Sequence, residues 1–418
     1  MIQKYTEDYA ASWKQSKPNF PFTSNKFTLI EKEARENILD QYIGSVKTLR
    51  KGRLNQKRLT KKEENSFIAG TRNFLRDGLD FTDHQLEVMF SDELREVTRQ
   101  FVRQARDFDS ALTFHDIFQA LRNAWIMNGL QIVLGLPVKL TPSIFAYSLL
   151  YPYTDNLIDN PEVSTIDKLI FSNNFYSRLD GQASEPNNTT EQIIFSLVAM
   201  IEAEFPRSAY PEVYQSLMAI HKAQTRSIQL IQSDNSLSED ETLEICIAKG
   251  GASVLADGYL VAGKLSKDQE YFLFGYGAYL QLLDDVQDAG EDRAAGLQTI
   301  FSKSDDFLEA KLNSTYWFGE QVMQNLSLFG GQHLEVFKSL MRKSMDLFII
   351  EAIAQNPDFY TKEYGSRMEA YSPYSFSYIQ KQKEQFAPYN GFLLTAIQEI
   401  AFNEYVPAGR VREIAFEE

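Results

Sequence analysis

The stretch YFLFGYGAYLQLLDDVQDAGED, residues 271–292, decides the fold and points to the chemistry. Its first half carries almost no polar side chains, and its end places Asp284, Asp288 and Asp292 four residues apart. In a helix, residues four apart share one face, so these carboxylates are expected to stack near the end of an apolar helix. Negative charge at a helix C-terminus costs about 0.3–1 kcal/mol per group. The pattern therefore predicts an offsetting positive charge, such as bound cations.

The composition favours a globular protein that does not bind nucleic acid. The chain has 418 residues, of which 44% are hydrophobic and 13% aromatic, enough for a large core. Its net charge of −15 provides no overall basic field that would attract phosphate backbones. Cys246 is the only cysteine, which excludes an internal disulfide and a cysteine-based zinc site and suggests a buried thiol.

Helical periodicity dominates, and no series of alternating strands is evident. Ser238 precedes Glu241, and Ser266 precedes Gln269, by three residues, a capping-box pattern that marks two helix starts. The second of these helices carries the aspartates. The predicted fold class is all-α.

The first hundred or so residues are more charged than the rest. We predict a helical accessory region over residues 1–105 and a main helical domain over residues 106–418. The basic segment Lys47–Lys62 is most simply a solvated helix face or linker, with contact to an anionic membrane surface as the alternative. The N-terminal segment lacks the apolar run of a signal peptide, and the longest uncharged stretches, Trp125–Val138 and Leu140–Thr154, are short for a membrane span. A soluble, cytoplasmic protein is therefore expected.

A second acidic pair strengthens the case for a metal site. Asp155 and Asp159 lie four residues apart and follow the apolar segment IFAYSLLYPY, residues 144–153. Facing Asp284 and Asp288, this pair would hold divalent cations through oxygen ligands, and Mg²⁺ commonly combines one or two carboxylates with substrate phosphate oxygens. The spacing does not match an EF-hand calcium loop.

These motifs resemble those of the class I isoprenoid synthases. The segment QLLDDVQD, residues 281–288, looks like the second aspartate-rich motif of trans-prenyltransferases, and DAGED, residues 288–292, is similar to a squalene/phytoene synthase segment. The segment TDNLID, residues 154–159, looks like the first acidic motif of bacterial class IB, or large-terpene, synthases such as tetraprenyl-β-curcumene synthase. The absence of a DDxxD first motif argues against ordinary chain-elongating prenyltransferases.

The resemblance implies a helical bundle around a central apolar cavity, with Asp155, Asp159, Asp284 and Asp288 as catalytic residues. Three Mg²⁺ ions would be held by these four residues together with Asp285 and Asp292. Aromatic rings on the two motif helices become candidates for the cavity wall, which must be dry to protect an allylic cation. The candidates are Phe145, Tyr151, Phe274 and Tyr279, with Tyr147 and Tyr276 beside them.

Four basic residues are candidates for binding the diphosphate. Arg293 follows Asp292 directly, and Lys249 precedes Gly250-Gly251, where we expect its helix to break. Arg207 is a further option. Arg122 lies in the apolar segment ALRNAWIMNGLQ, residues 120–131, and is expected to need a buried partner.

The predicted function is an Mg²⁺-dependent terpene synthase that ionises a long-chain prenyl diphosphate, releases diphosphate and forms a hydrocarbon. The alternatives are head-to-head condensation, as in squalene/phytoene synthases, and an inactive helical homologue. His115-Asp116 suggests an HD-type phosphohydrolase, but four histidines are too few for its ligand set, and a ferritin-like di-iron site lacks its ExxH pattern. Oligomeric state, product and cyclisation pattern are left open by the sequence.

Overall fold

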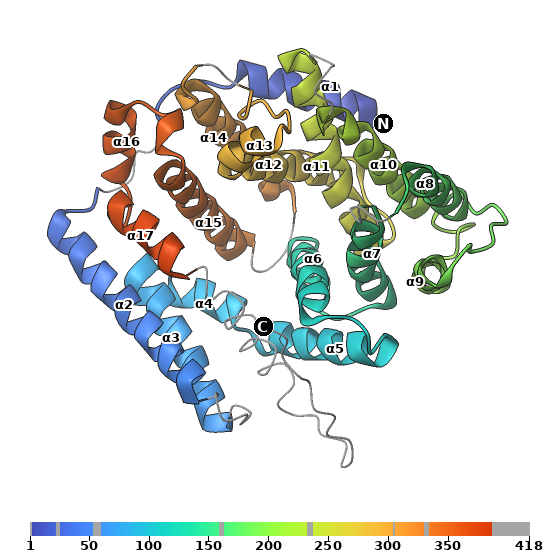
Figure 1. Cartoon of the computed structure of the whole chain (residues 1–418), viewed down its shortest axis with the longest axis horizontal. Helices are drawn as coiled ribbons and strands as arrows, with labels where there is room; N and C mark the ends of the chain where they lie inside the picture. Colours follow the sequence, from blue (N-terminus) through green and yellow to red (C-terminus); the bar gives the residue numbers. More distant parts are fainter. Residues whose placement is uncertain are drawn as a thin grey trace.

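The fold is entirely helical over the part of the chain that the computed structural model describes. It describes residues 2–21, 26–52, 60–158, 163–231, 237–303, 306–329 and 334–386, and within these ranges no strand occurs. The all-α prediction is confirmed. Figure 1 shows α11 and α12 side by side, with the other helices arranged around this pair.

The central pair consists of α11 (Glu239–Ala262) and α12 (Lys267–Gln287), and both predicted capping boxes are present. The Ser238 side chain accepts a hydrogen bond from the Glu241 backbone N–H, and Ser266 does the same for Gln269. The short connection between the helices turns at Gly263, whose φ of 72° favours glycine. α12 therefore starts and packs as the sequence pattern indicates.

Glycines bring α11 and α12 into direct backbone contact. A Cβ atom on Gly277 would lie 2.2 Å from the backbone oxygen of Gly250, and a Cβ on Gly250 would lie 2.4 Å from the oxygen of Gly277. α11 runs unbroken through Gly250-Gly251, so the predicted break beside Lys249 is wrong. The glycines serve close packing here rather than a change of helix direction.

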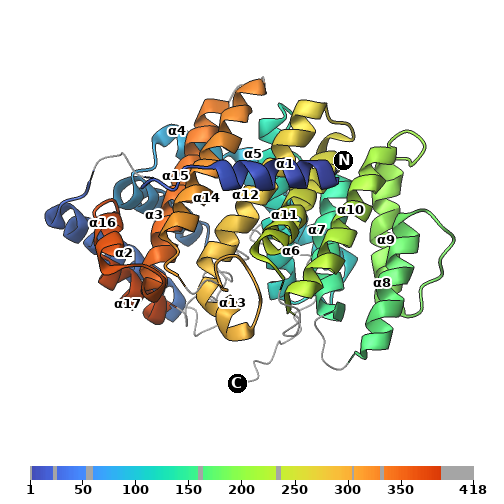
Figure 2. The same cartoon turned by 90° about the horizontal axis from the view of Figure 1, so that it is seen from above.

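The first helix belongs to the core. In α1 (Ile2–Gln15), Tyr5, Tyr9 and Trp13 are buried, and the helix crosses α11, α12 and α14 (Figure 2). The Tyr9 hydroxyl donates to the Tyr271 backbone oxygen at 2.7 Å, and its ring occupies the space beside Gly275. The start of the expected accessory region thus packs directly on the helix that carries the acidic motif.

The remaining helices surround this core. Nearest to it are α6 (Phe114–Val133), α7 (Pro142–Ile158), α10 (Pro211–Ser227), α14 (Glu309–Gln324) and α15 (Leu334–Gln355). Further out lie α2 (Leu29–Gly52), α3 (Lys61–Leu79), α4 (Asp83–Met89), α5 (Asp92–Phe108), α8 (Thr165–Leu179), α9 (Thr189–Glu204), α16 (Lys362–Glu369) and α17 (Phe376–Phe386). The short helix α13 (Ala289–Ala295) follows α12, and single 3₁₀ turns cover Ile228–Ile231, Asn325–Leu328 and Pro357–Phe359.

One helix and one basic segment bear on the predicted relation to membranes. One helix in the described ranges, α11, is long and apolar enough to cross a bilayer by length and composition, and 78% of its most apolar window is buried inside the protein. That burial fits a core helix. The basic segment Lys47–Lys62 runs from the end of α2 to the start of α3, and its residues 53–59 lie outside the described residues.

Candidate active site

The acidic cluster Asp284, Asp288 and Asp292 is stacked as predicted. α12 ends at Gln287 and α13 begins at Ala289, yet helical hydrogen bonds continue across the junction. The backbone N–H of Asp288 donates to the Asp284 oxygen at 2.9 Å, and that of Asp292 donates to the Asp288 oxygen at 2.7 Å. The four-residue spacing therefore places the three residues on successive turns of one helical face.

Burial and mutual repulsion make the acidic cluster hard to ionise. Burial, followed by the charges of Asp285, Asp288 and Asp284, raises the pKa of Asp292 to about 7. The pKa of Asp288 is also raised, by burial first and then by Asp284 and Glu291. Both effects disfavour the charged carboxylate, so a nearby cation would stabilise the fully ionised cluster.

Two cationic side chains from other helices face this cluster. The Asp284 side chain is exposed, but partial burial by the surrounding protein raises its pKa. The positive charges of Lys249 on α11 and Arg122 on α6 oppose this rise. Lys249 acts in the same direction on Asp292. Basic groups on α6 and α11 thus lie close enough to the acidic end of α12 to affect the pKa values there.

Arg122 does not occupy the buried setting predicted for it. Its neighbours Leu121, Ala124 and Met127 are buried, whereas the Arg122 side chain is exposed. The prediction of a buried partner is wrong because Arg122 lies on the face of α6 that these apolar residues leave free. Its charge is instead available near Asp284.

Asp285 has a different environment from its neighbours. Its side chain is only 5% exposed, at the interface of α11 and α12. Its Oδ1 accepts a hydrogen bond from the Gln281 side-chain nitrogen at 2.8 Å, and its Oδ2 is buried without a hydrogen-bond partner in the described part of the chain. Burial is the largest cause that raises its pKa to about 6. Asp285 therefore lies in the packed interface between the motif helix and α11, and Cys246 is the buried thiol that the sequence suggested.

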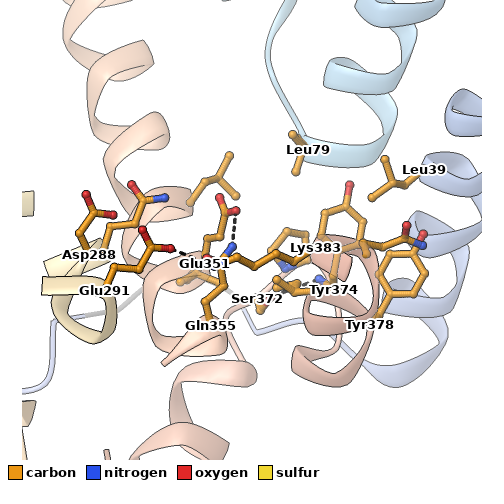
Figure 3. Close-up of a pocket in the computed structure, with 16 residues that line it drawn as sticks. Leu39, Leu79, Asp288, Glu291, Glu351, Gln355, Ser372, Tyr374, Tyr378 and Lys383 are labelled. Atoms are coloured by element: carbon orange, nitrogen blue, oxygen red, sulfur yellow. Dashed lines mark hydrogen bonds and ion pairs between the residues drawn. The ribbon is translucent and has the colours of Figure 1, made fainter. Parts of the chain in front are cut away.

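A cavity of about 520 Å³ opens beside the acidic cluster (Figure 3). Asp288 and Glu291 stand at one end, and Tyr374 and Tyr378 stand at the other. Leucine and isoleucine side chains from α2, α3, α15 and α17 form the apolar part of the wall: Leu39, Leu79, Leu347, Ile350 and Ile379. Polar side chains, among them Glu351, Gln355 and Gln382, also line the cavity, so it combines charged, polar and apolar surface.

Lys383 crosses the cavity from α17. Its ammonium nitrogen lies 4.0 Å from a Glu291 carboxylate oxygen and donates to the Gln355 side-chain oxygen at 2.9 Å. Gln355 in turn donates to Glu351 at 2.7 Å. Neither Lys383 nor Glu351 was predicted from the sequence, because both lie on helices that carry no recognisable motif. Only the fold brings them to Asp288.

The first acidic motif is described in part. Asp155 lies near the end of α7, but its side chain, that of Tyr151 and the whole of Asp159 lie outside the described residues. Among the described side chains, no three histidines, cysteines, aspartates or glutamates form a group that could hold a metal ion. The six-aspartate metal site thus stays a prediction.

Two of the predicted diphosphate-binding residues have structural contacts instead. Arg293 donates from Nε to the Ser302 backbone oxygen at 2.8 Å and stacks on the Phe359 ring. Arg207 donates to Glu202 and to the backbone oxygens of Leu179 and Arg178, and its guanidinium lies 3.8 Å from the centre of the Tyr214 ring. Arg207 therefore fixes the chain between α8, α9 and α10 rather than the acidic site.

Three of the predicted cavity residues belong to the packed core. Phe145 is fully buried against Phe101 and Phe108, and Phe274 is fully buried against Tyr5 and Tyr9. Tyr279 packs on Gly319 and Phe318. The prediction that these rings line the cavity is wrong, because they lie on the helix faces that hold the bundle together. Tyr276 is likewise buried, and Tyr147 borders a small separate pocket.

Comparisons with known proteins give low similarities. No family model matches the chain, and no curated protein matches its sequence. A geranyltransferase structure from Legionella pneumophila is 14% identical and covers 77% of this chain and 98% of its own, with a TM-score of 0.36. A decaprenyl diphosphate synthase structure from Rhodobacter capsulatus is 12% identical and covers 76% and 98%, with a TM-score of 0.31. Because these similarities are low, the function has to be argued from the site itself.

Proposed function

We propose that this protein is an Mg²⁺-dependent enzyme that ionises a long-chain prenyl diphosphate, releases diphosphate and forms a terpene hydrocarbon. One arrangement carries the proposal: Asp284 and Asp288 end a buried helix, the positive charges of Arg122 and Lys249 act on Asp284, and a cavity whose wall is partly apolar opens beside Asp288. A metal-binding anion and a hydrocarbon group are the two parts of a substrate that such a site suits.

The donor set fits Mg²⁺. Asp284 and Asp288 supply carboxylate oxygens on successive turns, and burial raises the pKa of both, so a bound cation would stabilise their charged forms. Substrate phosphate and water would complete the ligands, since Mg²⁺ keeps several waters in enzyme sites. The sequence resemblance adds Asp155, Asp159 and Asp292 as further ligands. When bound, the metal supplies Lewis-acid stabilisation of the leaving diphosphate.

The chain's own residues have separable tasks in this scheme. Arg122 and Lys249 bind the anionic end of the substrate through charge-assisted hydrogen bonds, and Asp285 holds α12 at a fixed position against α11. Leu347 and Ile350 exclude water beside the reacting carbon, which protects an allylic cation from premature capture. The faces of Tyr374 and Tyr378 offer electron density to that cation.

Incubation with Mg²⁺ and labelled prenyl diphosphates of several chain lengths tests the proposal. We expect release of diphosphate and a hydrocarbon with the carbon number of the substrate; a doubled carbon number would identify head-to-head condensation instead. Asp284→Ala should lower turnover by more than about a hundredfold without loss of helical structure.

Asp268→Ala is the matched control, because Asp268 is an exposed aspartate in the first turn of the same helix. It should retain full activity. Full activity in Asp284→Ala, or no diphosphate release by the unaltered protein from any chain length, would contradict the proposed function.

A further inference from the structure

A second cavity lies between the N-terminal helices and the main bundle. This N-terminal pocket has a volume of about 570 Å³ and is enclosed by α3, α4 and α5 on one side and α6 and α15 on the other. Figure 1 shows these helices next to one another, with α5 beside α6 and α4 beside α15. Its wall is mainly apolar and aromatic: Phe67, Ile68, Val88, Met89, Phe90 and Trp125.

Most polar groups in this wall already have partners. The Trp125 indole N–H donates to the Thr98 hydroxyl at 2.9 Å, and the Tyr42 and Thr71 hydroxyls are 3.0 Å apart. The two arginines at the pocket have acidic partners outside the wall, Arg95 with Asp92 and Arg99 with Glu64, although Nε of Arg95 is buried without a hydrogen-bond partner in the described part of the chain. A ligand that needs several hydrogen bonds would find few there. The pocket is therefore suited to a largely apolar group.

Helix α6 links this pocket to the acidic site. Trp125 and Gly129 follow Arg122 by three and seven residues, so all three lie on one face of α6. Arg122 faces Asp284, and the other two line the pocket. At a rise of about 1.5 Å per residue, Ile132 at the far side of the pocket wall lies about 15 Å along the helix from Arg122.

Helix α15 borders both cavities. Phe337 and Leu340 line the N-terminal pocket, and Leu347 and Ile350 line the cavity beside Asp288. Leu340 and Leu347 share a face of the helix, but Lys343 and Ser344 occupy the turn between them. Helix α15 therefore contributes to the walls of both cavities without a continuous apolar surface between them.

We propose that the N-terminal pocket binds the distal hydrocarbon part of the substrate, so that helices α3–α5 select long prenyl chains. The placement of the diphosphate at Asp284 rests on the function proposed above, whereas the affinity of the pocket for hydrocarbon does not. A short chain anchored at Arg122 reaches only the near side of the pocket at Trp125, about 4.5 Å along the helix, whereas a long chain extends past Gly129 to Ile132. The N-terminal helices thereby acquire a defined role in substrate choice.

Gly129→Leu is the test variant. Gly129 lies inside α6, and a Cβ there would meet only the Phe337 ring at 3.5 Å, an ordinary contact distance. Leucine is also a better helix former than glycine, so the fold is expected to tolerate it while the side chain fills the pocket. Gly44→Leu on α2 is the matched control, because nothing lies within 4 Å of its added Cβ and Gly44 does not line the pocket.

The first measurement is binding of geranylgeraniol, an uncharged prenyl alcohol, followed by tryptophan fluorescence because Trp125 lines the pocket. We expect binding by the unaltered protein and by Gly44→Leu, and at least about tenfold weaker binding by Gly129→Leu. If Gly129→Leu alters the fold, as judged by its circular dichroism, Leu340→Phe provides a second way to fill the pocket. Equal affinity in the unaltered protein and a folded pocket-filling variant would overturn the proposal.

The second measurement is Mg²⁺-dependent diphosphate release from geranyl, farnesyl and geranylgeranyl diphosphate. Gly129→Leu should shift the preference toward the shorter chains by at least about tenfold, and Gly44→Leu should not. An unchanged chain-length preference would contradict the inference. If no chain length is turned over by the unaltered protein, the proposed function fails, and alcohol binding alone then decides the role of the pocket.

Discussion

Gly250 and Gly277 hold the two central helices so close that neither position has room for a methyl group. An added Cβ on Gly277 would lie 2.2 Å from the backbone oxygen of Gly250. This contact sets the distance between α11, which carries Lys249, and α12, which carries Asp284. The geometry of the acidic site therefore depends on two residues that have no side chain.

Gly277→Ala should lower the free energy of unfolding by about 1–3 kcal/mol. Alanine gains up to about 1 kcal/mol over glycine within a helix, but the clash is with a backbone atom that cannot rotate away. Urea unfolding measures the difference. Gly44→Ala on α2, where an added Cβ meets nothing within 4 Å, should instead stabilise by about 0.5–1 kcal/mol. Equal effects of the two substitutions would contradict the role of this contact.

The sequence predicted the local features of the fold well because their signals are local. The capping boxes at Ser238 and Ser266 mark the starts of α11 and α12 correctly, and the spacing of Asp284, Asp288 and Asp292 predicts their shared face. Each of these features depends on residues within a few turns of one another, which the period of a helix relates directly.

Features that depend on which face of a helix meets which neighbour were predicted less well. Phe274 and Tyr279 follow the apolar pattern of α12, but that pattern cannot distinguish a core face from a cavity face. Lys383 and Glu351 reach the site from helices far along the chain. The charge of Arg122 acts on Asp284, but its side chain is exposed rather than buried, and its contact with a diphosphate stays a prediction.

Asp285→Asn should cost at most about tenfold in turnover, whereas Asp284→Asn should cost more than about a hundredfold. Asp285 is buried between α11 and α12 and accepts a hydrogen bond from Gln281, so an amide oxygen keeps much of its structural role. Asp284, by contrast, is subject to the positive charges of Arg122 and Lys249. Mg²⁺ titration of both variants with inorganic diphosphate provides a readout besides turnover. A greater loss in Asp285→Asn than in Asp284→Asn would make Asp285 the ligand.

Arg122→Gln and Lys249→Gln should each raise the KM for a prenyl diphosphate about tenfold or more, because each removes a charged donor that faces Asp284. Both should also weaken binding of inorganic diphosphate in the presence of Mg²⁺, as measured by calorimetry.

Arg207→Gln is the contrasting variant. Arg207 donates to Glu202 and to two backbone oxygens between α8 and α9, so its replacement should lower the free energy of unfolding and leave KM unchanged. An unchanged KM in both Arg122→Gln and Lys249→Gln would exclude the predicted contact with the diphosphate.

Asp257 should make the stability of the protein depend on pH. Its carboxyl is 1% exposed in the middle of α11, and Oδ1 has no hydrogen-bond partner within the described part of the chain. Burial raises its pKa to about 8, opposed only by a hydrogen bond with Asn123. Between about pH 4 and pH 8 the folded state therefore keeps a proton that the unfolded state has released, and stability falls as the pH rises through this range.

Asp257→Asn removes this dependence, because an amide does not titrate. Relative to the unaltered protein, the variant should gain a few kcal/mol in free energy of unfolding between pH about 5 and pH about 8, since each pKa unit corresponds to about 1.4 kcal/mol. Urea unfolding of both proteins across this range measures the difference. Parallel stability curves for the two proteins would show that Asp257 ionises in the folded state as readily as in the unfolded chain.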